Sequence, residues 1–255
     1  MPIQPVHRIA AGLRIGKSRT VSVGRLAVTG RVSAQGGGSL KDLADELRDV
    51  GYVRVKAVSE DETTLEIARR FGSISVISGV APVQELIPRS VEQASTSSYG
   101  GMYGLGQFPL HTDMAHWHVP PRYFLLRCMH PAPEVKTLVL HSQDVFGDED
   151  EITLRRALFR PRRRLDSRLT CLRLYENGRC RWDPVFIVPI TNCAVELRQR
   201  VLRRIESART VELSLEDPLD CIVLDNWSAL HGRTDVPSKC THRILERVYL
   251  DSVKP

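Results

Sequence analysis

The stretch GQFPLHTDMAHWHVPP, residues 106–121, contains three of the eight histidines of the chain within eight positions. Its first histidine, His111, is separated by one residue from Asp113. On an extended strand two such side chains point to the same side, and at the end of a strand both could reach one cation. A His-x-Asp pair is a weak signal by itself, because a polar loop rich in histidine shows the same pattern. Whether the stretch forms a metal site therefore depends on a further ligand elsewhere in the chain.

A third candidate ligand lies far downstream. His231 follows the apolar run of CIVLDNWSALHG, residues 221–232, where a strand would deliver its side chain to the same place as His111 and Asp113. Two imidazoles and one carboxylate leave three coordination positions open, which is the facial arrangement of non-haem Fe(II) oxygenases. The three residues predict an Fe(II) site whose open positions admit a bidentate cosubstrate and then O2.

Two arginines follow His231 by 12 and 16 residues. Because an even number of positions separates Arg243 from Arg247 in HRILERVYL, residues 242–250, both side chains share one face of a strand. A buried guanidinium that faces the metal would suit a dicarboxylate cosubstrate, since its planar fork binds a carboxylate through two hydrogen bonds. Either arginine alone would more simply form a surface salt bridge.

The sequence around these residues is typical of short strands interrupted by a few helices. Strands are predicted where apolar residues alternate, and Asn177-Gly178 between two alternating segments is a strong hairpin signal. The predicted strands lie within residues 20–32, 52–58, 122–129, 136–142, 170–182, 221–232 and 242–252. Because strands and helices do not alternate regularly, we predict a mostly β fold with flanking helices, a double-stranded β-helix or jelly roll.

Four helices are predicted from the spacing of apolar residues and from capping residues. Ser39 is the expected N-cap of the first helix. Ser59 and Glu62 form the expected capping box of the second helix, which should end at Gly72. The predicted helices cover residues 39–51, 59–72, 148–159 and 191–209, the last with Ala194, Leu197, Val201 and Ile205 buried. Residues 79–109 are rich in Pro, Ser and Gly, and we predict a loop there.

The composition indicates a soluble globular protein. Hydrophobic residues make up 42% of the 255 residues, which is enough for a buried core. No stretch approaches the ~18 to 20 consecutive apolar residues of a membrane span. Since no repeat or linker divides the chain, we expect one domain over residues 1–255, located in the cytoplasm and without a membrane partner. The six cysteines contain no C-x-x-C pair and are expected to be reduced thiols, and a homo-oligomer remains open.

The net charge of +6 comes from an unevenly distributed excess of arginine. Residues 1–41 contain no Asp or Glu, a pattern that a transit peptide or a nucleic-acid-binding arm would also show. The alternation within residues 20–32 instead favours edge strands for the basic segment 1–38. A second basic cluster, residues 160–168, has no aromatic residues that could stack on bases, so we expect no nucleic-acid partner.

The order of three motifs carries a resemblance to a known family. They are FPLHTDMAHWHVPPRYFLLRCMHPAP (108–133), VLDNWSALHGRTDV (223–236) and HRILERVYLD (242–251). In this order the chain resembles the taurine dioxygenase (TauD/TfdA-like) family of Fe(II)- and 2-oxoglutarate-dependent oxygenases, from about residue 39 to 251. The resemblance implies a jelly-roll domain that uses Fe(II), 2-oxoglutarate and O2 and that releases succinate and CO2.

The resemblance also assigns roles to single residues. It implies that His111, Asp113 and His231 are the iron ligands, and that Arg243 pairs with the distal carboxylate of 2-oxoglutarate. Thr137 matches the threonine of the family that forms a hydrogen bond with the cosubstrate.

Two further assignments and two departures follow from the same resemblance. Arg247 matches a second arginine that reaches the substrate or the cosubstrate in some members, and Gln107 falls where some members place an amide that contacts the substrate. The sequence at 134–136 reads Glu-Val-Lys, where the family usually has a glycine pair. The chain is also short between residues 113 and 231, which suggests a trimmed lid over the site.

The residues beside the motif are candidates for substrate contact. The HWH triplet, residues 116–118, could line the substrate pocket or pack against the protein, whereas further metal ligands from one loop would close the position that O2 needs. The segment YGGMY, residues 99–103, lies where a lid is expected. We take His116 and Tyr103, together with Gln107, as the predicted substrate contacts.

The predicted function is hydroxylation of an unactivated C–H bond of a small molecule that is anionic or resembles an amino acid. The excess of arginine, with Arg181 and Arg247 among them, suggests an anionic substrate. The same centre could instead catalyse desaturation or cyclisation. Halogenation is disfavoured because the carboxylate of Asp113 takes the position that a halide would need. An alternative from another class is a non-catalytic jelly-roll protein that binds a structural metal.

Overall fold

The computed structural model describes residues 19–23, 26–30, 43–56, 61–96, 98–163 and 170–254. Ser39 and Ser59, which were predicted to cap the first two helices, lie outside the described residues. The same holds for residues 164–168 of the second basic cluster.

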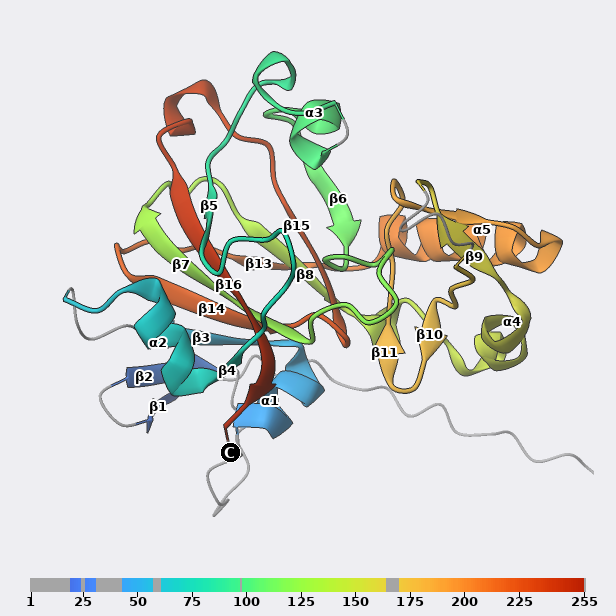
Figure 1. Ribbon diagram of the computed structural model, residues 1–255, viewed down its shortest axis with the longest axis horizontal. Helices are drawn as coiled ribbons and strands as arrows, with labels where there is room; N and C mark the ends of the chain where they lie inside the picture. Colours follow the sequence, from blue (N-terminus) through green and yellow to red (C-terminus); the bar gives the residue numbers. More distant parts are fainter. Residues whose placement is uncertain are drawn as a thin grey trace, which may run out of the picture.

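A large antiparallel sheet forms one layer of the fold (Figure 1). Its strands run in the order β1-β2-β3-β14-β7-β16-β4, and β5 pairs with β16 beside this path. Their bounds are β1 (Arg19–Val23), β2 (Leu26–Gly30), β3 (Tyr52–Lys56), β14 (Asp220–Asp225), β7 (Tyr123–His130), β16 (Ile244–Val253), β4 (Gly72–Ile74) and β5 (Gln84–Leu86). The basic N-terminal strands β1 and β2 therefore lie at one edge of this sheet.

A smaller antiparallel sheet packs against the large one and carries the histidines. Its order is β13-β8-β15-β6, with bounds β13 (Val211–Leu213), β8 (Thr137–His141), β15 (Ala229–Arg233) and β6 (Phe108–His111). The large residues between the two sheets come from both, with Phe124 and Tyr249 from the large sheet and Val139 from the small one. This two-sheet antiparallel architecture confirms the predicted mostly β, jelly-roll fold.

The central strand β7 has an apolar sequence, YFLLRCMH, over most of its length because both of its faces are buried. Phe124 and Leu126 face the small sheet, whereas Tyr123 and Leu125 face the opposite side. Two helices, α1 (Leu43–Val50) and α2 (Thr64–Phe71), cover that opposite side. A strand that is buried on both faces reads as a continuous apolar run, as it does here.

The capping of α2 differs from the prediction. Thr63, not Ser59, is the N-cap, and Glu66 completes the capping box by accepting from the backbone N–H of Thr63 at 2.8 Å. The segment offers the Ser/Thr-x-x-Glu pattern twice, and the later copy is used because it directly precedes the buried Ile67. The helix ends before Gly72 as predicted. A Cβ at Gly72 would lie 1.7 Å from the backbone oxygen of Ser252, so the close approach of β16 requires glycine there.

The chain between β8 and β14 forms a further cluster of elements, whose apolar core is shared with the small sheet through Leu138 and Leu140 of β8 and Leu230 of β15. It lies on the right of Figure 1 and includes α4 (Glu151–Arg156), β9 (Phe159–Pro161), β10 (Tyr175–Glu176), β11 (Arg179–Cys180), β12 (Ile187–Pro189) and α5 (Asn192–Ser207). Trp182, Leu174 and Leu197 are buried in this core. Short 3-10 helices η2 (Ser142–Asp144) and η3 (Asp148–Asp150) precede α4, and η4 (Ser238–Cys240) precedes β16.

The predictions for this cluster of elements were largely correct. α5 buries Ala194, Leu197 and Val201 as predicted, with Ile205 partly buried. The Asn177-Gly178 turn is confirmed: the two residues have φ values of 53° and 73°, and they join β10 to β11 in a tight hairpin. The helix predicted over 148–159 is shorter, because Phe159 already pairs in β9.

The prediction of a loop over residues 79–109 was wrong in part. The segment contains β5, the 3-10 helix η1 (Val91–Gln93), the short helix α3 (Tyr99–Tyr103) and the first half of β6. These elements span three to five residues each, which is too short to show a period in the sequence. In Figure 1, α3 stands at the start of β6, over the small sheet. Within the described part of the chain, no helix combines the length and apolar character that crossing a bilayer requires.

Candidate metal centre

The structure brings together the three predicted metal ligands, which are far apart in the sequence. His111 ends β6 and lies opposite His231 of β15 in the register of the small sheet, with 4.6 Å between the ring centroids. Asp113 follows β6 by two residues. One ligand atom from each residue lies within 4.8 Å of the others, and all three side chains are buried.

The distances from the Asp113 carboxylate to both imidazoles fit a shared cation. Oδ1 of Asp113 lies 3.6 Å from Nε2 of His111 and 3.5 Å from Nε2 of His231, too far for strong hydrogen bonds. Ligand atoms about 2 Å from one ion lie roughly 3 to 3.5 Å from one another, so these spacings suit a small divalent ion. The backbone oxygen of Pro109 accepts a hydrogen bond from Nδ1 of His111 at 2.9 Å, which leaves Nε2 free to coordinate.

Other side chains hold the carboxylate and the backbone of Asp113. Its second oxygen, Oδ2, accepts from Nη1 of Arg247 at 2.7 Å and from the Tyr249 hydroxyl at 3.0 Å. Its backbone N–H donates to Oδ1 of Asn226 at 2.7 Å, and Nδ2 of Asn226 donates back to the Asp113 carbonyl at 3.0 Å and to that of Pro121 at 2.9 Å. The ligand loop is thus fixed to the turn between β14 and β15.

The electrostatics of the site favour the ionised carboxylate. Burial acts to raise the pKa of Asp113, but the guanidinium of Arg247 and then the charge of His231 hold this pKa well below its usual range. Burial lowers the pKa of His231 despite the opposing effect of Asp113, which favours the neutral imidazole that binds metal. For His111, burial also acts to lower the pKa, but the nearby carboxylate of Asp113 outweighs it and raises the pKa.

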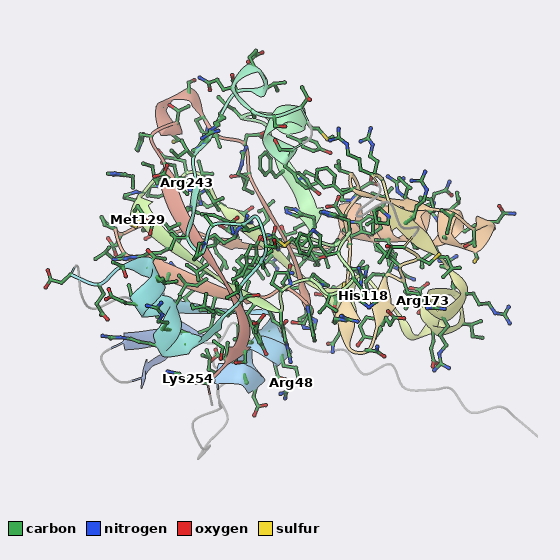
Figure 2. The ribbon with its side chains drawn as sticks, viewed as in Figure 1. Arg48, His118, Met129, Arg173, Arg243 and Lys254 are labelled. Carbon is green, nitrogen blue, oxygen red and sulfur yellow. The ribbon has the colours of Figure 1, made fainter. Side chains whose placement is uncertain are left out.

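Arg243 is a buried cation without a carboxylate partner among the described residues. It directly precedes β16, as Figure 2 shows, and only 6% of it is exposed. Its Nη2 atom is buried and has no hydrogen-bond partner. Burial lowers the pKa of Arg243 to about 10, and the nearby thiol of Cys128 does not neutralise it, because burial raises the pKa of Cys128 to about 11. An isolated buried charge costs free energy, so the position suits an anionic ligand.

The other two predicted cofactor residues occupy different surroundings. Thr137 is buried at the start of β8, where it pairs with Arg233 of β15. Arg247 lies against the metal site: besides Asp113, it contacts Oε1 of Gln84 in β5 at 2.6 Å. Nε of Arg247 and Nε2 of Gln84 are both buried without a hydrogen-bond partner. Arg247 is thus tied to a metal ligand, a contact that the sequence analysis did not anticipate.

Aromatic side chains gather beside His111, with Tyr99 of α3 in direct contact and Phe186 packed edge-on against Tyr99. The ring of Tyr99 stacks on His111 with 4.4 Å between centroids, and its hydroxyl donates to Oδ1 of Asp183 at 2.9 Å. Tyr103, a predicted substrate contact, stacks on Tyr99 at 5.8 Å. The ring of His116, another predicted contact, lies 5.8 Å from that of Phe186.

Two predicted residues have placements that bear less directly on the site. Gln107 is exposed, just before β6. Arg181, which suggested an anionic substrate, is instead a buried structural residue: its terminal nitrogens donate to the carbonyls of Ala115, Trp117 and His118 at 2.6 to 3.2 Å. This is a correction, because the guanidinium fixes the loop after Asp113; Figure 2 labels His118 in that loop.

Sequence reasoning did not find four residues that the structure places at the site: Gln84, Asp183, Asn226 and Tyr249. Asn226 and Tyr249 lie within the quoted motifs, but their contacts with Asp113 depend on the folding of three separate segments. Gln84 reaches Arg247 only because β5 joins the edge of β16. Asp183 follows the hairpin and carries no local signal.

Comparison with known proteins shows similarity at the level of the fold. No protein-family model matches the chain, and no curated protein matches its sequence. The structure of an asparagine oxygenase in complex with Fe(II), 2S,3S-3-hydroxyasparagine and succinate matches with a TM-score of 0.62 and 18% identity, covering 82% of this chain and 78% of that one. The non-heme iron oxygenase OrfP in complex with Fe, succinate and (3S)-hydroxy-L-Arg matches with a TM-score of 0.58 and 19% identity, covering 82% and 77%. OrfP in complex with Fe and alpha-ketoglutaric acid gives a TM-score of 0.55 and 22% identity over 71% and 60%.

These structures place the chain in the class of jelly-roll proteins that non-haem iron oxygenases share. At such low identity the similarity concerns the fold, and the site stands on its own geometry. The buried His-Asp-His cluster has the composition of two imidazoles and one carboxylate that is typical of facial Fe(II) sites.

Proposed function

We propose that this chain is an Fe(II)- and 2-oxoglutarate-dependent dioxygenase that hydroxylates a small, amino-acid-like molecule. The convergence of His111, Asp113 and His231 carries the proposal, because two imidazoles and one carboxylate in a buried site leave coordination positions for a cosubstrate and O2. The unpaired guanidinium of Arg243 supports the choice of 2-oxoglutarate as that cosubstrate.

In this proposal each part of the site has a separate task. His111, Asp113 and His231 hold Fe(II). Once 2-oxoglutarate and O2 are bound, the iron supplies the oxidation of an unactivated C–H bond, with release of succinate and CO2. Arg243 pairs with the distal carboxylate of 2-oxoglutarate, and the hydroxyl of Thr137 donates a hydrogen bond to the cosubstrate.

The aromatic side chains above the metal ligands would orient the substrate and exclude water. Tyr99 stacks on His111, and Tyr103 and Phe108 extend the apolar surface with ring centroids 5.8 and 5.7 Å from that of Tyr99. Water exclusion matters because the reactive centre must oxidise the substrate rather than the solvent or the protein. Tyr103, His116 and Gln107 remain the predicted substrate contacts in this proposal.

The polarity of the pocket supports an amino acid as the substrate. Nε2 of Gln84 and Nε of Arg247 are buried donors without partners, which suit the carboxylate of a substrate. Arg247 is thereby proposed to act toward substrate or cosubstrate, as the resemblance implies. Tyr99 connects Asp183 to His111, because its hydroxyl donates to Asp183 and its ring stacks on His111. Asp183 is therefore placed to accept a hydrogen bond from a polar group at the end of the substrate that lies away from the metal. The similar structures hold hydroxyasparagine and hydroxy-L-Arg, which is consistent with this class.

Formation of succinate tests the proposal. Purified protein with Fe(II), ascorbate, O2 and 2-oxoglutarate should form succinate slowly alone and faster with the correct amino acid, while His231→Ala should form none. Mass spectrometry of the product then distinguishes hydroxylation, a gain of one oxygen, from desaturation or cyclisation, a loss of two hydrogens. A non-catalytic metal-binding protein would form no succinate with any substrate. The cytoplasmic location, the single domain over residues 1–255 and a homo-oligomer also remain predictions.

A further inference from the structure

The two oxygens of Asp113 have different surroundings. Oδ1 faces the two histidines at 3.5 and 3.6 Å. Oδ2 points away from them and accepts two hydrogen bonds, from Arg247 at 2.7 Å and from Tyr249 at 3.0 Å. The carboxylate is therefore fixed by hydrogen bonds to Oδ2, and Oδ1 is directed toward the metal position.

This difference affects how many positions remain open at the metal. A carboxylate can bind a cation through one oxygen or through both, and the second mode occupies a further position. A cosubstrate that binds through two atoms and O2 together need three positions. If Oδ2 turned toward the metal, it would lose both donors, each a charge-assisted hydrogen bond in a buried site.

We propose that Tyr249 is a positioning residue that, together with Arg247, keeps Asp113 bound to the metal through Oδ1 alone. The inference rests on the proposed function, since it concerns the same metal. Tyr249 belongs to β16 and is 3% exposed, so its hydroxyl is shielded from water that could replace Asp113 as a partner. Asp113 is the partner of this hydroxyl.

Tyr249 and Arg247 contribute in different ways. Arg247 divides its two terminal nitrogens between Asp113 and Gln84, so a substrate carboxylate in the pocket would compete for it. The Tyr249 hydroxyl has no second hydrogen-bond partner among the described residues, and the Arg247 guanidinium lies 4.8 Å from the centroid of its ring. That ring packs edge-on against Phe124 at 6.2 Å, and Phe124 in turn contacts the ring of His231 at 4.7 Å. Tyr249 thus holds Asp113 whether or not the substrate occupies Arg247.

Tyr249→Phe tests the inference, because it removes one oxygen atom and keeps the ring. Thr64→Val is the control: it also removes a buried hydroxyl that donates to a carboxylate, but that carboxylate belongs to Glu246, whose side chain points to the opposite face of β16 from that of Arg247. Metal affinity is measured by titration with Co(II), whose visible absorption weakens as its coordination number rises. Loss of a residue that orients a metal ligand lowers metal affinity by about 10- to 100-fold. We expect that loss and a weaker Co(II) band for Tyr249→Phe, and neither for Thr64→Val.

The outcomes separate the inference from the proposed function. If the wild-type protein binds neither Co(II) nor Fe(II), the proposed function fails. If the wild type binds metal and Tyr249→Phe shows the same affinity and spectrum, the inference fails while the function stands. An equal loss in Thr64→Val would indicate a general effect on packing and would also overturn the inference. Should Tyr249→Phe not fold, Arg247→Lys is expected to change the Co(II) spectrum in the same direction, and an unchanged spectrum would contradict the proposal.

Discussion

Replacing Arg243 by methionine should change ligand binding and stability in opposite directions. Methionine retains an unbranched apolar stem of similar reach and removes the charge. Arg243 is 6% exposed, and its Nη2 atom has no hydrogen-bond partner among the described residues. Removing an unpaired buried charge relieves a desolvation cost, so the free energy of unfolding without ligand should stay equal to that of the wild type or rise.

The effect on 2-oxoglutarate should be large. Losing one partner of a buried, hydrogen-bonded charge pair costs about 2 to 5 kcal/mol. Since about 1.4 kcal/mol corresponds to a tenfold change in affinity, Arg243→Met should weaken 2-oxoglutarate binding by about 30-fold to a few thousand-fold. Anaerobic calorimetric titration with Mn(II) bound in place of iron measures this affinity without turnover, and chemical denaturation measures the stability of the ligand-free protein.

Arg233→Met provides the matched comparison. Arg233 is also a largely buried arginine, and burial, followed by the charge of Arg243, lowers its pKa to about 10. Its nitrogens, however, donate to the carbonyls of Gly104, Leu105 and Thr234. This substitution should therefore destabilise the ligand-free protein by about 1 to 3 kcal/mol, because it leaves carbonyl groups unpaired. The reasoning is refuted if Arg243→Met binds 2-oxoglutarate within threefold of the wild type, or if it destabilises the ligand-free protein as Arg233→Met does.

Three further predictions follow from the site and the core. Metal at a hundredfold excess over its dissociation constant should stabilise the wild type by about 2.7 kcal/mol, and His231→Ala should abolish this stabilisation. Melting curves with and without Co(II) measure the effect, and an equal shift in both proteins would place the metal elsewhere. Asn226→Ala should lower the free energy of unfolding by about 3 kcal/mol, since it breaks three buried hydrogen bonds at the Asp113 loop, and a loss below about 1 kcal/mol in urea denaturation would contradict those contacts. A thiol reagent at pH 8 should label the exposed Cys171 rapidly in the native protein. Cys128 is fully buried and its pKa is raised to about 11, so it should be labelled only after unfolding. Comparable labelling rates, measured by mass spectrometry, would show that the central strand is accessible.

The features that could be predicted from sequence are those with a strong local pattern. The β7 strand, the hairpin at Asn177-Gly178 and the helix α5 follow from apolar spacing and turn chemistry, and all three are observed. The convergence of His111 and His231 could also be predicted, because each ends or occupies a strand of the small sheet. Pairing of β6 with β15 then places them opposite each other.

The features that could not be predicted depend on contacts between distant segments. The helix α3 has five residues and is placed by the stacking of Tyr99 on His111, which no local pattern encodes. The contact of Arg247 with Asp113 requires both the position of β16 and the loop after β6. Arg181 was interpreted as a ligand-binding charge because sequence does not reveal its three carbonyl acceptors. A buried arginine is equally suited to a ligand or to the backbone, and the fold alone decides between them.

The most direct test of the central claim is an anaerobic titration of the protein with Fe(II) and 2-oxoglutarate, monitored by visible absorption. We expect a charge-transfer band that saturates at one iron per chain in the wild type, shifts when the correct amino acid is added, and is absent in His231→Ala and Asp113→Ala. A folded wild-type protein without the band, or a variant lacking either ligand that retains it, would contradict the assignment of this site.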